Sequence, residues 1–313
     1  MAVKNYNYKG RVRKTPQYDE YTGSSVDISF DIVNETELGK ERLRFDTTIR
    51  YVSQGKGETL LLVHGIGQSL YTWRHSMDYF VSCGYRVIAL DLAGCGYSGH
   101  PNIYFTVEEQ ALVLEAFMKA LRIKTAHVVA FSTGALSAIC FAYAHPQRVN
   151  RLVLVSPGGP NENYPFALRV LTSWLGRKIF MTYLSESTVR RLLGDYFFDA
   201  TQLRPEVVEG YYRPFRSRDV RETLVMMMAH FDDAYARSLL KGVRHRTLVV
   251  SGLEDKLHGE DMIRDFVLII PGAEHVRLRN CGHFVHEEKP DRFNEAVRVF
   301  LNKQYAWEDE EPI

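Results

Sequence analysis

Residues 130–134 read AFSTG, and they join the apolar run HVVA at 127–130 to the small-residue stretch ALSAICFAYAHP at 135–146. This pattern predicts a strand, a sharp turn at Ser132 and then a helix. A serine here is either a helix N-cap or a nucleophile held on a tight strand-to-helix turn. A tight turn needs small residues two positions to either side. Gly134 meets that condition, and Ala130 adds a single methyl group.

The surrounding chain alternates between short apolar runs and helical patterns. The runs read TLLLVHG (59–65), YRVIALD (85–91), AHVVAF (126–131), RLVLVSP (151–157) and RTLVVSG (246–252). Their length and Val, Leu and Ile content are typical of strands buried on both faces. Helical patterns cover residues 69–84, 106–123, 134–146 and 289–303. The sequence therefore predicts an α/β fold with a mostly parallel sheet, to which the alternating stretches 26–33 and 44–52 add an antiparallel edge.

The alternation stops between about residues 158 and 240, where the chain is helical, aromatic and basic. A helical insertion between strands of a parallel sheet is expected to cover the carboxyl edge, where such sheets bind ligands. The predicted organisation is an arm at 1–25, a core domain at 26–157 and 241–304, a cap domain at 158–240 and an acidic tail at 305–313.

Composition limits the possible functions. The formal net charge of +1, from 39 basic and 38 acidic residues, offers no general attraction for nucleic acid or an anionic membrane. The basic, polar start is unlike a secretory signal, and no apolar stretch approaches the roughly 18 residues of a membrane helix. The four scattered cysteines indicate reduced thiols in a cytoplasmic protein and no cysteine metal site. We expect no cofactor and no metal; the oligomeric state is left open.

Three residues with complementary chemistry follow predicted strands. Ser132 follows AHVVAF, Asp255 lies in GLED after RTLVVSG, and His283 lies in CGHF after EHVRLRN. Because parallel strands end at one edge, these side chains can meet there. A serine hydroxyl needs a base to become a nucleophile, histidine titrates near neutral pH, and a carboxylate orients the imidazole. The order Ser, acid, His is that of the nucleophile-elbow hydrolases.

A second element is the loop VHGIGQS at 63–69. Attack on an acyl group places negative charge on the carbonyl oxygen, and backbone N–H groups can stabilise it. The expected donors are the amide of Thr133, at the start of the helix after Ser132, and the amide of Ile66. The flanking Gly65 and Gly67 allow that backbone to approach a substrate closely.

Other residues compete for these roles. Glu254 and Asp261 lie in the same loop as Asp255, and His286 lies close to His283. We interpret His286 as structural, and we expect structural roles for three more residues near the site: His64, Asp91 and Ser98. Nothing near Cys95, in the same loop as Asp91 and Ser98, indicates an activated thiolate.

The predicted cap supplies candidates for a substrate pocket. Trp174, Phe180, Tyr183 and Met227 are the candidate lining residues, although packing within the cap and against the main domain is the favoured explanation for such residues. The cap arginines are interpreted as a solvated face; they are Arg190, Arg191, Arg213, Arg216 and Arg218.

Taken together, these motifs resemble the α/β-hydrolase superfamily, in the branch with a helical cap after the sixth strand. The resemblance covers residues 26–303 and rests on six landmarks: HGIGQS, ALDLAGCGYSGHP, AFSTG, RLVLVSPGG, LVVSGLED and CGHFVHEEKPDRFNEAVRVFL. It implies Ser132 as nucleophile, Asp255 as acid, His283 as base, and Ile66 and Thr133 as oxyanion-hole donors. Three departures are Ala130 in place of glycine, Arg246 in place of the proline before the acid's strand, and DKLHGE in place of a proline after the acid.

The expected function is a cofactor-independent serine hydrolase that cleaves a small-to-medium apolar acyl substrate, a carboxylic ester first. The alternatives on the same triad are carbon–carbon bond hydrolysis, thioester hydrolysis and acyl transfer. A ligand-binding protein that keeps the fold without turnover is the non-enzymatic alternative, and the complete set of three residues argues against it.

Overall fold

The computed structural model describes residues 23–36, 39–100, 105–160 and 173–302. Eight strands form one sheet in the order β1-β2-β4-β3-β5-β6-β7-β8. Their bounds are β1 Ser24–Thr36, β2 Gly39–Gln54, β3 Thr59–Val63, β4 Arg86–Leu90, β5 Ala126–Phe131, β6 Val149–Val155, β7 Arg246–Gly252 and β8 Glu274–Leu278. From β4 to β8 all neighbours are parallel, while β1 pairs antiparallel with β2, and β2 with β4. The predicted α/β class and antiparallel edge are confirmed.

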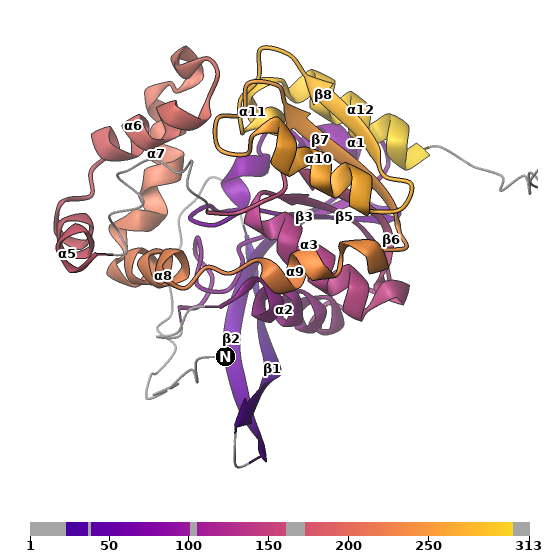
Figure 1. The fold of residues 1–313 in the computed structure, drawn as a ribbon, viewed down its shortest axis with the longest axis horizontal. Helices are drawn as coiled ribbons and strands as arrows, with labels where there is room; N and C mark the ends of the chain where they lie inside the picture. Colours follow the sequence, from indigo (N-terminus) through magenta and orange to yellow (C-terminus); the bar gives the residue numbers. More distant parts are fainter. Residues whose placement is uncertain (1–22, 37–38, 101–104, 161–172, 303–313) are drawn as a thin grey trace, which may run out of the picture.

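The hairpin β1–β2 is the long arm that extends beyond the body of the molecule in Figure 1. Its strands bury alternate residues, with Ile28 and Phe30 of β1 against Phe45 and Ile49 of β2. The period of two in the sequence produces this one-sided burial. β1 begins at Ser24, within the segment 1–25 that the sequence predicts as an N-terminal arm. Residues 1–22 of that segment and the tail at 305–313 lie outside the described residues.

The central strands bury side chains on both faces, which explains their continuous apolar runs. In β3, Leu61 and Val63 belong to the hydrophobic cluster on one face, and Leu60 and Leu62 to the cluster on the other. Helices α2 Val107–Ala120, α3 Thr133–Ala144, α9 Ala234–Ser238 and α10 Glu260–Ile269 contribute to the first cluster. Helices α1 Met77–Ser82 and α12 Pro290–Asn302 contribute to the second.

Local signals in the sequence explain where two helices begin. Thr106 and Glu109 form a capping box at the start of α2, in which the Thr106 hydroxyl accepts from the Glu109 amide and the Glu109 carboxylate accepts from the Thr106 amide. Pro290 occupies the first position of α12. The pattern at 69–84 is not one helix: it divides into a 3₁₀ turn, η1 Leu70–Trp73, and α1.

Four helices between β6 and β7 lie together to one side of the sheet: α5 Trp174–Tyr183, α6 Glu186–Tyr196, α7 Pro205–Tyr212 and α8 Arg218–Ala229 (Figure 1). We refer to them as the cap helices. Their buried side chains continue the second cluster, and Phe197 and Tyr211 contact Phe284 of the core with ring centroids 5.0 and 5.9 Å away. The division into core and cap domains stays a prediction. In the described part of the chain, no helix combines the length and apolar character needed to cross a membrane.

Candidate active site

The sheet brings Ser132, Asp255 and His283 together at its carboxyl edge. Ser132 follows β5, Asp255 follows β7 and His283 follows β8. His283 Nε2 lies 3.1 Å from Ser132 Oγ, and His283 Nδ1 lies 2.8 Å from Asp255 Oδ2. Because a carboxylate only accepts, Nδ1 carries the proton, which leaves Nε2 as the acceptor of the serine proton. All three side chains are buried.

The backbone of Ser132 is strained, with φ of 54° and ψ of −124°. A non-glycine residue with positive φ is uncommon and costs on the order of 1–3 kcal/mol, so the surrounding contacts must hold it. The Ser132 amide donates to the Val155 carbonyl at 2.9 Å. A Cβ at Gly134 would lie 2.2 Å from the His64 carbonyl oxygen, so the turn requires glycine there. The methyl group of Ala130 fits inside the first hydrophobic cluster.

Asp255 is held by its own loop. Its Oδ1 accepts from the amides of Leu257 at 2.9 Å and His258 at 3.1 Å. Burial acts to raise the pKa of Asp255, but the pKa lies below its ordinary value because His283 and the His258 amide stabilise the carboxylate. The competing carboxylates are engaged elsewhere: Glu254 accepts from the Cys281 amide, and Asp261 forms an exposed ion pair with Arg264.

His258 lies at the site although it was not among the residues predicted from the sequence. Its buried ring stands edge-to-face on His283, with centroids 4.7 Å apart at 89°, and its Nδ1 donates to the Ser156 carbonyl at 3.1 Å. Burial lowers its pKa to about 4, so the ring is neutral at pH 7. Its position three residues after Asp255 was the feature of the sequence that could have indicated a place near the site.

Asp255, His258 and His283 each offer one ligand atom within 4.8 Å of the others, so by composition they could hold a metal ion. The hydrogen bonds already described account for the grouping of these three residues. The triad arrangement therefore explains the cluster without an ion.

The expected oxyanion donors lie beside Ser132. A Cβ at Gly65 would lie 2.9 Å from Ser132 Cβ, which places the loop after β3 directly against the serine. Thr133 is the first residue of α3, so its amide is among those without an intrahelical acceptor. The Ile66 amide, however, donates to the Thr133 hydroxyl at 2.7 Å. Its hydrogen is engaged within the protein, which differs from the expected free donor.

A cavity of about 750 Å³, including the part open to solvent, lies between Ser132 and the cap helices. Its lining is almost entirely apolar and comprises Ile66, Gly67, Gln68, Ser132, Phe180, Leu184, Val189, Leu192, Leu193, Tyr196, Tyr211, Phe215, Leu224, Met228, Leu257, His283 and Phe284. Among the described residues that line it there is neither lysine nor arginine.

The four residues expected to line the pocket lie in different environments. Phe180 lines the cavity as expected. Trp174 and Tyr183 do not line it. The buried face of α5 carries Phe180, whereas Trp174 and Tyr183 point to solvent and are 76% and 74% exposed. Met227 lines a second cavity of about 440 Å³ between α8 and the core, while its neighbour Met228 lines the large one. Successive helical residues point about 100° apart, which separates the two methionines.

The residues expected to be structural support the surrounding loops. His64 Nδ1 donates to the Gly65 carbonyl and its Nε2 accepts from the Leu92 amide. The Asp91 carboxylate accepts from the amides of Leu70 and Tyr97, and the Ser98 hydroxyl donates to the Asp91 carbonyl.

Two further expectations concern groups outside the proposed chemistry. Burial raises the pKa of Cys95 to about 12, which keeps this thiol protonated. The cap arginines are not part of the large cavity's lining. Arg213 and Arg216 pair with Glu209, and Arg218 pairs with Glu222.

A carboxylate joins the segment after α6 to the loop that carries His283. Glu288, in α11 Val285–Glu288, accepts from the Gly282 amide through Oε1 and from the amides of Phe198 and Asp199 through Oε2. One side chain thus ties the segment after α6 to the loop that carries His283.

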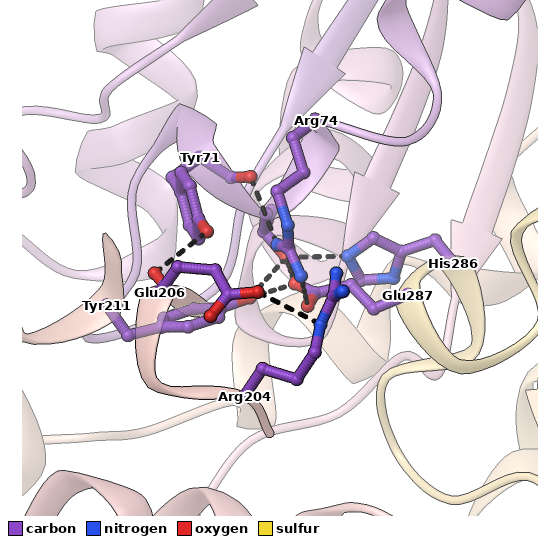
Figure 2. Close-up of polar contacts among 8 residues, drawn as sticks. Tyr71, Arg74, Arg204, Glu206, Tyr211, His286 and Glu287 are labelled. Atoms are coloured by element: carbon purple, nitrogen blue, oxygen red, sulfur yellow. Dashed lines mark hydrogen bonds and ion pairs between the residues drawn. The ribbon is translucent and has the colours of Figure 1, made fainter. Parts of the chain in front are cut away.

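A second link is the buried polar network shown in Figure 2. Glu287 pairs with Arg74 at 2.6 Å and accepts from Tyr211 of α7 and from Thr72 at 2.7 Å. His286 Nε2 donates to the Thr72 hydroxyl at 2.6 Å, which fits its expected structural role. Burial acts to raise the pKa of Glu287, but Arg74 and the hydroxyl donor hold it below its ordinary value. Tyr211 also lines the large cavity, so one side chain forms part of the cavity wall and donates a hydrogen bond to the buried network.

Comparison with known proteins identifies the family to which this chain is similar. Residues 58–290 match the family described as the alpha/beta hydrolase fold. A 2-hydroxy-6-oxononadienedioate/2-hydroxy-6-oxononatrienedioate hydrolase of Paraburkholderia phymatum is 31% identical over 87% of this chain and 95% of its own. A 2-hydroxy-6-oxo-6-phenylhexa-2,4-dienoate hydrolase of Comamonas testosteroni is 27% identical over 83% and 93%.

Solved structures show the same similarity. A meta-cleavage product hydrolase from Pseudomonas fluorescens superposes with a TM-score of 0.71 at 25% identity, over 82% of this chain and 94% of its own. An esterase from Thermogutta terrifontis, at 22% identity over 87% and 97%, has a TM-score of 0.69 and shares the fold. From the order of its strands, its strained serine and the matched family, the chain belongs to the α/β-hydrolase fold family.

Proposed function

We propose that this protein is a serine hydrolase that cleaves a neutral, apolar acyl compound, with a carboxylic ester as the first candidate. The observation that carries the proposal is the hydrogen-bonded series from Ser132 through His283 to Asp255, which borders a large apolar cavity. A nucleophile, its base and an orienting carboxylate are the groups that acyl transfer to water requires.

The reaction follows from the positions of these groups. Ser132 Oγ attacks the carbonyl carbon while His283 Nε2 takes its proton. The negative charge that develops on the carbonyl oxygen is stabilised by donors beside Ser132. His283 then protonates the leaving group, and the acyl group stays on Ser132. His283 next takes a proton from water, which attacks the acyl-enzyme, and Ser132 is released with its proton restored.

The lining of the large cavity supports a neutral substrate. The relatives are named as hydrolases of dienoates and dienedioates, which are carboxylates. A carboxylate buried without a cation costs several kcal/mol, and no lysine or arginine is among the described residues that line this cavity. An uncharged acyl chain gains free energy from the same apolar surface.

Carbon–carbon bond hydrolysis is the second candidate. It is favoured by the 31% identity to a 2-hydroxy-6-oxononadienedioate/2-hydroxy-6-oxononatrienedioate hydrolase across nearly the whole of that protein. The same serine would attack a ketone carbonyl, and the bond broken would be to carbon instead of oxygen. Thioester hydrolysis and acyl transfer use the same groups and remain alternatives on this site.

The decisive experiment has two stages. Wild type and Ser132→Ala are first treated with a fluorophosphonate and measured by intact mass. We expect one adduct on wild type and none on the variant. Both are then assayed on p-nitrophenyl esters of rising chain length and on an uncharged and a carboxylated vinylogous 1,5-diketone, with cleavage followed by absorbance.

Each outcome decides between the candidates. Turnover of esters supports the first, and turnover of the uncharged diketone with inert esters supports carbon–carbon hydrolysis. Preference for the carboxylated diketone would contradict the inference of a neutral substrate. A folded wild type that reacts with neither the phosphonate nor any substrate would contradict the hydrolase proposal and favour a ligand-binding protein.

A further inference from the structure

The Ile66 amide is a donor whose hydrogen is already in use. It donates to Thr133 Oγ1 at 2.7 Å, a distance typical of a strong hydrogen bond. One N–H makes one well-aligned bond at a time. A substrate oxygen that took this hydrogen directly would have to displace the Thr133 hydroxyl.

The Thr133 hydroxyl can donate as well as accept. It carries one hydrogen and two acceptor lone pairs, and Ile66 uses one lone pair. Within the part of the chain that the structure describes, no protein acceptor takes the hydroxyl hydrogen of Thr133. The residue is nevertheless buried, at a relative exposure of 6%, and follows Ser132 in the chain. Thr133 lines the second cavity and not the large one, whereas Ile66, whose amide it accepts from, lines both. The hydroxyl hydrogen therefore lies beside the residue that the two cavities share.

We propose that the Thr133 side chain is a catalytic oxyanion donor, with its hydroxyl giving a hydrogen bond to the developing oxyanion while the Ile66 amide polarises it from behind. The inference rests on the proposed hydrolase function. Thr133 then supplies two donors, its amide and its hydroxyl, and Ile66 acts through it. A hydroxyl that accepts from an amide becomes a stronger donor, because hydrogen bonds in series polarise one another.

The surroundings fix this arrangement before substrate binds. Gly65 lies against Ser132, so Ile66 cannot move away without disturbing the serine turn. Thr133 begins α3, where the amides of the first turn carry partial positive charge. A donor held in place in this way stabilises the oxyanion without a cost of reorganisation during the reaction.

Three variants distinguish this proposal from the alternative that the hydroxyl merely blocks the Ile66 amide. Thr133→Val keeps the shape and removes the hydroxyl, Thr133→Ser keeps the hydroxyl, and Thr133→Ala opens the space. The control Thr247→Val removes another buried threonine hydroxyl, which donates to the His245 carbonyl at the start of β7, away from Ser132. Thermal unfolding checks that each variant is folded.

The readouts are kcat and KM on an ester, and the Ki of a trifluoromethyl ketone, whose adduct on the serine places an oxyanion in the same position. We expect Thr133→Val and Thr133→Ala to lose roughly 10- to 100-fold in kcat, with KM nearly unchanged and Ki weakened by a similar factor. Thr133→Ser should restore most of the kcat and Ki that Thr133→Val loses, and the control Thr247→Val should stay within about threefold of wild type.

Two results would overturn the proposal. Wild-type kcat and Ki in Thr133→Val would show that the hydroxyl does not contact the oxyanion, and faster turnover in Thr133→Ala would show that it blocks the hole. The wild type separates these from a failure of the hydrolase proposal: a protein without phosphonate labelling or turnover overturns both proposals, whereas a reactive wild type with an unaltered Thr133→Val overturns only this one.

Discussion

The backbone amide of His283 donates a hydrogen bond to the carbonyl oxygen of Tyr196, 2.9 Å away. Tyr196 is the last residue of α6, so a cap helix directly holds the backbone of the proposed base. Glu288 strengthens this contact from the side through the Gly282 and Phe198 amides. Displacement of the end of α6 would therefore move the imidazole as well as the wall of the cavity.

Glu288→Gln tests this coupling. An amide side chain has one acceptor oxygen, so one of the two groups of backbone donors loses its partner and faces an NH₂ group. We expect kcat/KM on an ester to fall about tenfold and the free energy of unfolding to fall by about 1–3 kcal/mol. Steady-state kinetics and urea unfolding give the two values.

The matched control is Glu295→Gln on α12, which removes an exposed carboxylate paired with Arg298. Surface pairs of this kind contribute little, so both measurements should stay near wild type. Equal effects of the two substitutions would mean that Glu288 does not couple the cap helix to the base.

Asp255→Asn should leave the protein folded and nearly inactive. Asparagine can still accept from the loop amides, but its NH₂ group faces His283 Nδ1 and favours the tautomer in which Nε2 carries the proton. That tautomer cannot take the serine proton. We expect kcat to fall by about ten-thousand-fold, measured on the best substrate found.

Asp261→Asn changes a carboxylate at the start of α10, where the side chain is 89% exposed. Its activity should match wild type. If it loses as much activity as Asp255→Asn, the acid of the triad has been assigned to the wrong residue.

Glu287→Gln should destabilise the protein by about 3 kcal/mol. The substitution leaves Arg74 buried without its counter-charge, and removal of one partner from a buried ion pair is costly. The comparison is Glu206→Gln, because Figure 2 draws this residue in an exposed pair with Arg204 beside the buried one. We expect that change to stay within about 0.5 kcal/mol in urea unfolding. Similar losses in both variants would contradict the importance assigned to the buried pair.

Stability should fall as the pH drops below 6.5. Burial lowers the pKa of His286 to about 3 from an ordinary 6.5, and that of His258 to about 4. Between those values the unfolded chain binds protons that the folded chain does not, so each histidine removes about 1.4 kcal/mol per pH unit. Burial raises the pKa of Glu288, which acts in the opposite direction and reduces the total.

His286→Gln isolates one of these contributions. Between pH 7 and pH 5 the variant should lose roughly 2 kcal/mol less than wild type in urea unfolding, since its unfolded state lacks that site. His245→Gln, at a half-buried histidine before β7, serves as the comparison. A loss equal to that of wild type in His286→Gln would show that His286 is not the source of the acid sensitivity.

The sequence predicted the features that depend on the direction of the strands and on the spacing of apolar residues along the chain. Short apolar runs indicated the central strands, and parallel strands ending at one edge predicted that Ser132, Asp255 and His283 would meet. The contacts of His64 and Asp91 follow equally from their places in tight loops.

The sequence did not predict features that depend on how a helix is rotated about its axis. The helical pattern at 174–183 did not reveal that Phe180 faces the cavity while Trp174 and Tyr183 face solvent, because an apolar residue on a cap helix satisfies either environment. The hydrogen bond between Ile66, in the loop after β3, and Thr133, at the start of α3, joins residues 67 positions apart. It depends on the Thr133 side-chain rotamer, which no local sequence pattern specifies.

The separation of Ser132 from His283 by 151 positions has a consequence for protein synthesis. Translation runs from the amino terminus, so the serine emerges from the ribosome while the segment that carries its base is still unmade. Contacts of such long range also slow folding, because the entropy lost on closing a long loop has to be offset first. On the proposed function, a nascent chain would present an inert hydroxyl, and Ser132 would become a nucleophile only after β7, β8 and the loops that follow them have folded.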